Sequence, residues 1–251
     1  MRIHNSLIWL FLFFAGGLFS NQDLNLEISE IEIKEALYEI NTSYIKKPPF
    51  RKNKEIEDIF ESIFSKILPS AEKSCRKYLG NKSDCKWEVN YKDQNIFNAY
   101  ASGKNEITFY FGLARQTFHE DELAFVVAHE IGHHIGNHVR SSKTRAITGL
   151  ILGGLLGAAT GDPTIAANTA QAGANIAVGM YSSGQEVEAD FIAVEILSQS
   201  GFDLKKARDI HIRMTGVGAS AAFSGFLSSH PSGPERLIMH DRSTDYFRDN
   251  D

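Results

Sequence analysis

The sequence has little cysteine and no excess of positive charge. Only two cysteines occur among 251 residues, and they do not form the Cys-x-x-Cys pair of a thiolate metal site. Acidic residues outnumber basic ones by 31 to 26, a formal net charge of −5, so we expect no nucleic-acid partner. A hydrophobic fraction of 43% and a charged fraction of 23% argue against a disordered or fibrous protein. A chain of this length can bury one domain with a short appendage.

The apolar run near the N-terminus is short for a membrane span. A positive charge at Arg2 precedes apolar residues from Leu7 to Phe14, and the apolar stretch ends at Phe19, whereas a transmembrane helix needs about 20 residues. Small residues at 15–17 suit a cleavage site. We therefore expect residues 1–20 to be a signal peptide and the protein to be exported, in the periplasm or on the periplasmic side of a membrane. An uncleaved anchor is the alternative.

Export would place Cys75 and Cys85 in an oxidising compartment, where thiols pair. They flank a turn-rich stretch at 80–84 that can bring them together. We therefore predict a disulfide between them, which would stabilise the fold by about 2–3 kcal/mol through loop closure.

The spacing of apolar residues predicts an α+β fold that is mostly helical. Apolar residues recur at three- and four-residue steps from Ile56 to Leu68, which is typical of an amphipathic helix, and Pro69 is expected near its end. Alternating or β-rich runs at 87–91 and 106–111 indicate strands. Further helices are expected from about Ser29 onward, near 120–138, near 185–198, near 204–214 and near 234–240.

The chain after the signal divides into an N-terminal helical segment at 21–80 and a main domain at 81–251. Within that domain, residues 146–180 are almost uncharged and rich in glycine and alanine. We interpret them as a buried helical hairpin, whose arms are too short to cross a bilayer comfortably. A flap that touches a membrane or an envelope-assembly partner is the alternative.

Residues 129–133 read His-Glu-Ile-Gly-His, the motif that carries the chemistry. Positions four apart share one face of a helix, so His129 and His133 can bind one metal ion through their imidazoles. Glu130 lies one step round the helix, where it can take a proton from a water that the metal activates. Apolar residues at 123–128 bury this helix, and buried imidazoles need polar partners that a metal supplies. We therefore predict one zinc ion per chain, with Glu130 as general base.

The third metal ligand has two candidates. A site with three histidines would need one at position 139, but Val139 stands there and His138 comes one residue early. The other candidate is Glu186, which shares a face with Asp190 on a predicted helix, while Glu188 points elsewhere. In this arrangement Glu186 is the ligand, and Asp190 holds a ligand imidazole from behind.

With these residues the chain resembles the zinc metallopeptidases of the CAAX-prenyl-protease and HtpX type. The similarity covers roughly residues 87–240 and includes Asn98-Ala99, His138 and His230-Pro231. A signal without several apolar spans makes the chain most similar to the soluble exported branch, of which BepA and LoiP are bacterial examples. One departure is Gln185, because relatives often have an arginine just before the glutamate.

The resemblance implies a zincin-like metallopeptidase domain in which the edge strand of a small β-sheet lines the active-site cleft. It implies that the strand at 106–111 is this edge, along which an extended polypeptide substrate binds. Asn98, Ala99 and Ile107 would then contact the substrate. The resemblance also places His230 near the metal as a second catalytic residue, where it binds transition-state charge or plugs the open coordination position. Arg236 would support the site.

The expected function is that of a zinc-dependent endopeptidase acting on misfolded or envelope proteins. A periplasmic chaperone or assembly factor with a gated zinc site and little proteolysis is the alternative. A purely structural zinc module is a third class, but such a site fills four positions with protein ligands and has no use for an unliganded base such as Glu130.

Overall fold

The structure is a computed structural model and describes residues 26–102, 105–139, 162–165, 167–168, 181–216 and 224–250. The expected signal at 1–20 and nearly all of the hairpin at 146–180 lie outside these residues, and both stay predictions. None of the helices described combines the length and the apolar character that crossing a bilayer requires.

Helices make up most of the described chain, as the α+β prediction required, and that class is confirmed. Two helices precede the sheet, α1 (Glu30–Thr42) and α2 (Asn53–Leu79). The sheet consists of β1 (Glu88–Lys92), β2 (Ala99–Ala101) and β3 (Glu106–Tyr110). The helices that follow are α3 (Phe111–Gln116), α4 (Glu120–Ile135), α7 (Ser183–Gln199), α8 (Leu204–Ala207), α9 (Asp209–Thr215), α10 (Ser224–Leu227) and α11 (Pro234–Asn250).

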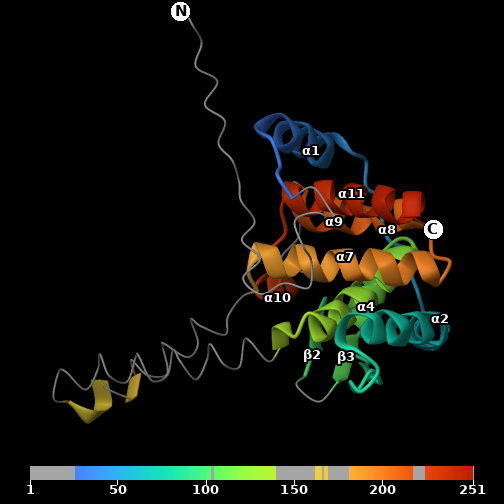
Figure 1. The fold of residues 1–251 in the computed structure, drawn as a ribbon, viewed down its shortest axis with the longest axis vertical. Helices are drawn as coiled ribbons and strands as arrows, with labels where there is room; N and C mark the ends of the chain where they lie inside the picture. Colours follow the sequence, from blue (N-terminus) through green and yellow to red (C-terminus); the bar gives the residue numbers. More distant parts are fainter. Residues whose placement is uncertain are drawn as a thin grey trace, which may run out of the picture.

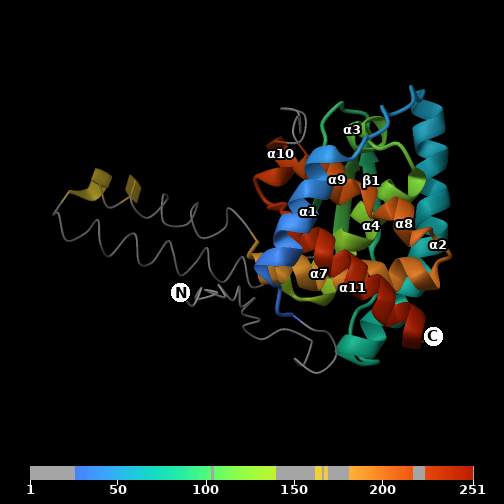
Figure 2. The ribbon, with the colours of Figure 1, turned by 90° about the horizontal axis from the view of Figure 1, so that it is seen from above.

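The long helices stack in layers with α4 and α7 at the centre. Figure 1 shows the order from α1 at the top through α11 and α7 to α4, with α2 and the sheet below. Figure 2 views this stack from above, with α1 in front of α11 and α7. Because α4 packs on α7 on one side and on α2 and β2 on the other, most of its residues are buried.

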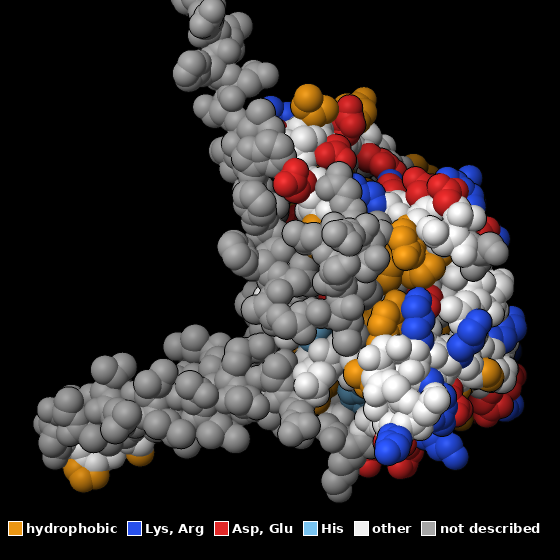
Figure 3. Space-filling view, in the orientation of Figure 1, with side chains coloured by type: hydrophobic (Ala, Val, Ile, Leu, Met, Phe, Trp, Pro, Cys, Tyr) orange, Lys and Arg blue, Asp and Glu red, His pale blue; other side chains and the backbone are white. Residues whose placement is uncertain are grey.

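Ion pairs and a small apolar cluster hold α1 against α11 and the residues before it. The cluster consists of Ala36, Ile40, Ile212 and Leu237. Ser29 caps α1, because its hydroxyl accepts from the Glu32 amide at 3.3 Å while its own amide donates to the Glu32 carboxylate at 2.9 Å. Glu32 also pairs with Arg242 of α11, and Glu39 pairs with Arg208. Figure 3 shows acidic and basic side chains mixed over this part of the surface. The acidic N-terminal segment is therefore packed against the body of the protein.

Helix α2 does not end near Pro69, and that prediction was wrong. The helix continues to Leu79, and its last turns bury Ala71 and Cys75 in the main core. Proline removes one backbone hydrogen bond from a helix interior, but burial of the turns that follow outweighs this loss. Cys75 and Cys85 form a disulfide. The core that contains α2 also contains α4 and α7, so it crosses the expected boundary at residue 80, and the division into 21–80 and 81–251 stays a prediction.

The strand expected at the edge of the sheet is its central strand. In the sheet described, β3 pairs in parallel with β1 and antiparallel with β2. The expectation that 106–111 forms the edge was therefore wrong, because β2 pairs outside it and has only three residues, too few to show a strand pattern in the sequence. Ile107 of β3 is fully buried and is not placed to touch a substrate. The edge strand beside α4 is β2, which contains Ala99 and follows directly after Asn98.

Candidate functional site

Helix α4 places the His-Glu-Ile-Gly-His motif in the interior, and its first turn is firmly held. Glu122 accepts from the backbone amides of Phe118 and His119, both at 3.2 Å. The same carboxylate pairs with Arg213 of α9, whose Nε lies 2.7 Å from it. These contacts satisfy donors at the start of the helix and fix its position.

Helix α7 brings the second half of the site against α4. Ser182 caps it, accepting from the Gln185 amide at 3.2 Å, while the Gln185 side chain accepts from the Ser182 amide at 3.1 Å. This cap fixes where the helix begins and so places Glu186 in its first turn. One turn later Asp190 lies on the same face, as helical spacing predicts.

Four buried side chains converge between these helices and the segment before α11. His129, His133, Glu186 and His230 each offer one potential ligand atom, and these atoms all lie within 4.8 Å of one another. The Nε2 atoms of His129 and His133 are 3.0 Å apart. Each lies 3.4 Å from one oxygen of the Glu186 carboxylate. The three ligands expected from the sequence thus come together, with His230 as a fourth member.

The chemistry of this group fits a zinc ion. Among the described residues, none forms a hydrogen bond to the carboxylate oxygens of Glu130, although this side chain is fully buried. A buried carboxylate of this kind is costly, and a cation held beside it lowers that cost. Two imidazole nitrogens and a carboxylate oxygen are the donor set of many catalytic zinc sites. His129, His133 and Glu186 would hold the ion.

Asp190 and Arg236 support the ligands from behind. Asp190 accepts from Nδ1 of His129 at 2.8 Å, which leaves Nε2 of that ring facing the ligand group. Arg236 of α11 donates two hydrogen bonds to Asp190, both at 2.7 Å. Its Nη1 lies 2.7 Å from Glu186. One buried guanidinium therefore balances two carboxylates and sets their orientation.

Burial and neighbouring charges shift the pKa values of the site in opposite directions. Burial raises the pKa of Glu130. Burial also disfavours charge on Glu186, but Arg236 and the nearby histidines outweigh it and hold the Glu186 pKa well below its usual value. For His129, burial lowers the pKa, but Glu186 and Asp190 prevail and raise it to about 9. A proton on His129 therefore competes with a metal ion at neutral pH.

The second imidazole of the motif behaves differently. Burial and the charge on His129 hold the pKa of His133 well below its usual value. His133 is therefore neutral at neutral pH, the form that binds metal.

His230 touches both the ligands and the predicted base. Its Nδ1 lies 3.2 Å from His129 Nε2 and 3.3 Å from Glu186. Its Nε2 lies 3.4 Å from Glu130. The ring stacks on Phe226 with centroids 4.3 Å apart, and this contact holds the imidazole in place. His230 can thus act as a fourth ligand or as a partner of Glu130.

Three further residues support His133, and their roles could not be predicted from the sequence. Nδ1 of His138 lies 2.9 Å from Nδ1 of His133, and Nε2 of His138 lies 3.1 Å from Glu188. Tyr181 stacks on the His133 ring with centroids 3.8 Å apart. The sequence marks His138 by its place just beyond the motif helix and by the family resemblance, but neither shows its contact with His133, and no pattern marks Tyr181.

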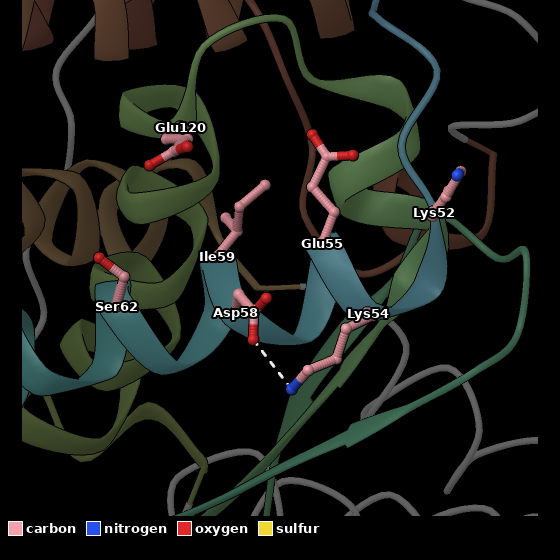
Figure 4. A pocket seen from close by; sticks show the side chains of 7 residues that line it. All are labelled: Lys52, Lys54, Glu55, Asp58, Ile59, Ser62 and Glu120. Atoms are coloured by element: carbon pink, nitrogen blue, oxygen red, sulfur yellow. Dashed lines mark ion pairs between the residues drawn. The ribbon is translucent and has the colours of Figure 1, made fainter.

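A surface pocket elsewhere does not belong to this site. Figure 4 shows it beside the first turns of α2 and the start of α4, with an ion pair of 2.9 Å between Lys54 and Asp58. The pocket is lined by Lys52, Lys54, Glu55, Asp58, Ile59, Ser62 and Glu120. None of these residues belongs to the metal-binding group, so the pocket is separate from that group.

Comparison with known proteins agrees with this geometry. The profile described as Peptidase family M48 matches residues 61–240. That span contains the motif on α4, the carboxylates on α7, His230 and Arg236. No curated protein matches the chain.

Proposed function

The chain belongs to peptidase family M48, and from this membership and its buried ligand group we propose that it is a zinc-dependent endopeptidase. One observation carries the proposal: Glu130, buried and without a hydrogen-bond partner among the described residues, lies 3.4 Å from His230, a member of the group of four potential metal ligands. A structural metal site would not need this extra carboxylate. We further propose that its substrates are misfolded or envelope proteins, because of the signal predicted at 1–20.

The residues of the site divide the work of hydrolysis. Bound zinc would supply a Lewis acid that polarises the peptide carbonyl and lowers the pKa of water toward about 7. His129, His133 and Glu186 would hold the ion, and Asp190 fixes the orientation of the His129 ring through its hydrogen bond to Nδ1. Glu130 takes a proton from the attacking water and returns it to the leaving amine. Its raised pKa favours this return, because a carboxyl that holds a proton well is a better base and a usable acid.

An extended polypeptide would bind along the outer edge of β2, which pairs with no second strand among the described residues. This edge lies beside α4, and backbone hydrogen bonds to it would orient any sequence in the same way. Asn98, at the start of the strand, has a buried side-chain oxygen with no partner among the described residues, which a substrate amide can use. Ala99 is buried and contributes its backbone only. Such a site selects unfolded chains, because a folded substrate cannot offer an extended strand.

Hydrolysis of casein by the zinc-loaded protein tests the proposal. Wild type should cleave it, and Glu130→Gln should keep its zinc but lose activity by about 10²–10⁴-fold, the usual contribution of a general base. Glu195→Gln is the matched control, because Glu195, on α7, is buried like Glu130 but pairs with Lys77 and Tyr78 outside the site. Full activity in Glu130→Gln would contradict the mechanism. His133→Ala should lose the metal itself.

A chaperone or assembly factor with a gated site is the second candidate, favoured by the position of His230. His230 belongs to the ligand group and its Nδ1 lies close to His129 and Glu186, so His230 can fill the position that a substrate carbonyl needs. In a gated site, His230→Ala would speed cleavage of a short peptide and weaken zinc binding. In the endopeptidase proposed above, His230 assists Glu130, and the same substitution would slow cleavage with zinc retained. Zinc content and peptide turnover of this variant therefore separate the two functions.

A further inference from the structure

The turn after α4 folds His138 back onto the metal-binding group. The helix ends at Ile135, and Asn137 then adopts a left-handed conformation with φ of 58°, which asparagine tolerates better than most residues. A Cβ placed on Gly136 would lie 2.5 Å from Nε2 of His138. The imidazole therefore occupies the space that a side chain at position 136 would need. The sequence Gly-Asn-His serves to put this ring behind His133.

His138 links His133 to a buried carboxylate. Its Nδ1 lies 2.9 Å from Nδ1 of His133, and its Nε2 lies 3.1 Å from Glu188. His138 and Glu188 are only 3% and 4% exposed. Glu188 comes from α7, two residues after Glu186. Each ligand imidazole thus has a carboxylate behind it: Asp190 directly for His129, and Glu188 through one intervening ring for His133.

Metal binding by His133 allows only one arrangement of protons along this chain. Nε2 of His133 faces the ligand group, so it must be unprotonated when it binds a metal, and the proton of the neutral ring is then on Nδ1. That N–H can only donate to Nδ1 of His138 if the latter carries no proton. The proton of His138 is then on Nε2 and is donated to Glu188. All three groups have compatible partners in this state.

We propose that His138 and Glu188 are positioning residues for the metal ligand His133. They fix its tautomer and ring orientation and make it a stronger donor, which partners of ligand histidines generally do. The inference rests on the proposed function in one respect only, namely that the buried group binds zinc. Hydrolysis is not needed to test it.

The first test is zinc affinity, measured by competition with a chromophoric chelator. His138→Ala should bind zinc about 10–100-fold more weakly than wild type, the usual cost of losing a partner of a ligand. His138→Asn should recover part of this loss, because its amide oxygen can accept from His133 near the position of the missing Nδ1. Glu188→Gln should lie between wild type and His138→Ala, since the amide keeps an acceptor but not the charge.

Two control variants exclude a general loss of packing. His134→Ala removes the neighbouring histidine, which accepts from Trp87 and not from the site. Glu195→Gln removes another buried carboxylate of α7. Both should bind zinc as wild type does. Equal affinity in His138→Ala and wild type would overturn the proposal, and so would equal losses in His138→Ala and His138→Asn.

The second test needs no variant. In zinc-loaded wild type with ¹⁵N-labelled histidine, NMR should show His133 protonated at Nδ1 and His138 protonated at Nε2. A proton on Nδ1 of His138 would overturn the proposal. Zinc-loaded wild type that fails to cleave casein would refute the peptidase and leave this result standing, whereas wild type that binds no zinc would refute both.

Discussion

The backbone of Ala189 on α7 lies against Gly132 of the metal-binding motif, so closely that a Cβ on Gly132 would be 2.6 Å from the Ala189 carbonyl oxygen. Glu186 and Asp190 lie on the same stretch of α7. The missing side chain at Gly132 therefore sets how near these carboxylates come to His129 and His133.

Substituting Gly132→Ala should separate the two helices and weaken the site. Alanine normally stabilises a helix by about 1 kcal/mol relative to glycine. The added methyl group would instead collide with backbone, which cannot rotate away, and overpacking of this kind costs about 1–3 kcal/mol. We expect a lower free energy of unfolding in urea and weaker zinc binding. A gain of stability would show that the helices can part without cost.

Zinc affinity should rise with pH until about pH 9. Burial lowers the pKa of His129, but Glu186 and Asp190 raise it to about 9, and a metal requires the neutral ring. Each ion bound near neutral pH should therefore displace about one proton, and affinity should rise about tenfold per pH unit. Calorimetric titrations in buffers of different ionisation enthalpy measure the protons released.

The same shift affects the stability of the metal-free chain in a defined direction. The folded-state pKa of His129 lies above its ordinary value of 6.5, so its contribution is fully present below that pH and is lost as pH rises through about 9. Asp190→Asn removes one carboxylate that raises this pKa and should move both effects to lower pH. Affinity that does not vary with pH would contradict the assignment.

Trp87 fluorescence should report the protonation of His134. Burial lowers the pKa of His134 from 6.5 to about 4, and its Nδ1 accepts from Trp87 Nε1 at 2.9 Å. Stability from the neutral ring is present above pH 6.5 and is lost as pH falls towards 4. Below that pH, Nδ1 carries a proton and the hydrogen bond breaks. The other tryptophan, Trp9, lies in the expected signal and is replaced in a Trp9→Phe background if the full chain is used. Emission from Trp87 should then change with a midpoint near pH 4, and His134→Ala should abolish the transition.

Removing the disulfide should lower stability without abolishing folding. The bond joins Cys75 near the end of α2 to Cys85, with a sequence separation of 10. Closing so short a loop stabilises a protein by about 2–3 kcal/mol, while the main core extends far beyond these residues. Urea denaturation of Cys75→Ala/Cys85→Ala should show a loss of that size. Retention of full stability would mean that the loop is held by its packing alone.

The parts of the site that obey helical spacing could be predicted from the sequence. His129 and His133 share a face of α4, and Glu186 and Asp190 share a face of α7, because positions four apart always do. The family predicted from these residues is confirmed by the match over 61–240. The start of α1 could also be predicted, because the capping contact between Ser29 and Glu32 is local.

The parts that depend on long-range packing could not be predicted. Glu188 does point away from the face of Glu186 and Asp190, but the turn at Asn137 brings His138 to meet it, and no local pattern encodes that meeting. The three residues of β2 are too few to show a strand period, so β3 was mistaken for the edge. Pro69 is a helix breaker by its own chemistry, yet the tertiary burial of Cys75 keeps α2 intact beyond it.

The order of the site residues along the chain has a consequence for its synthesis. His129 and His230 lie 101 positions apart, and Arg236, which balances Glu186 and Asp190, comes later still. A ribosome that has translated the motif has therefore made a helix with two histidines and a glutamate, but no finished site. The site would be complete only after the segment that leads into α11 has left the ribosome and packed against α4 and α7. A translation product that ends before this segment would contain the motif but would not cleave other proteins.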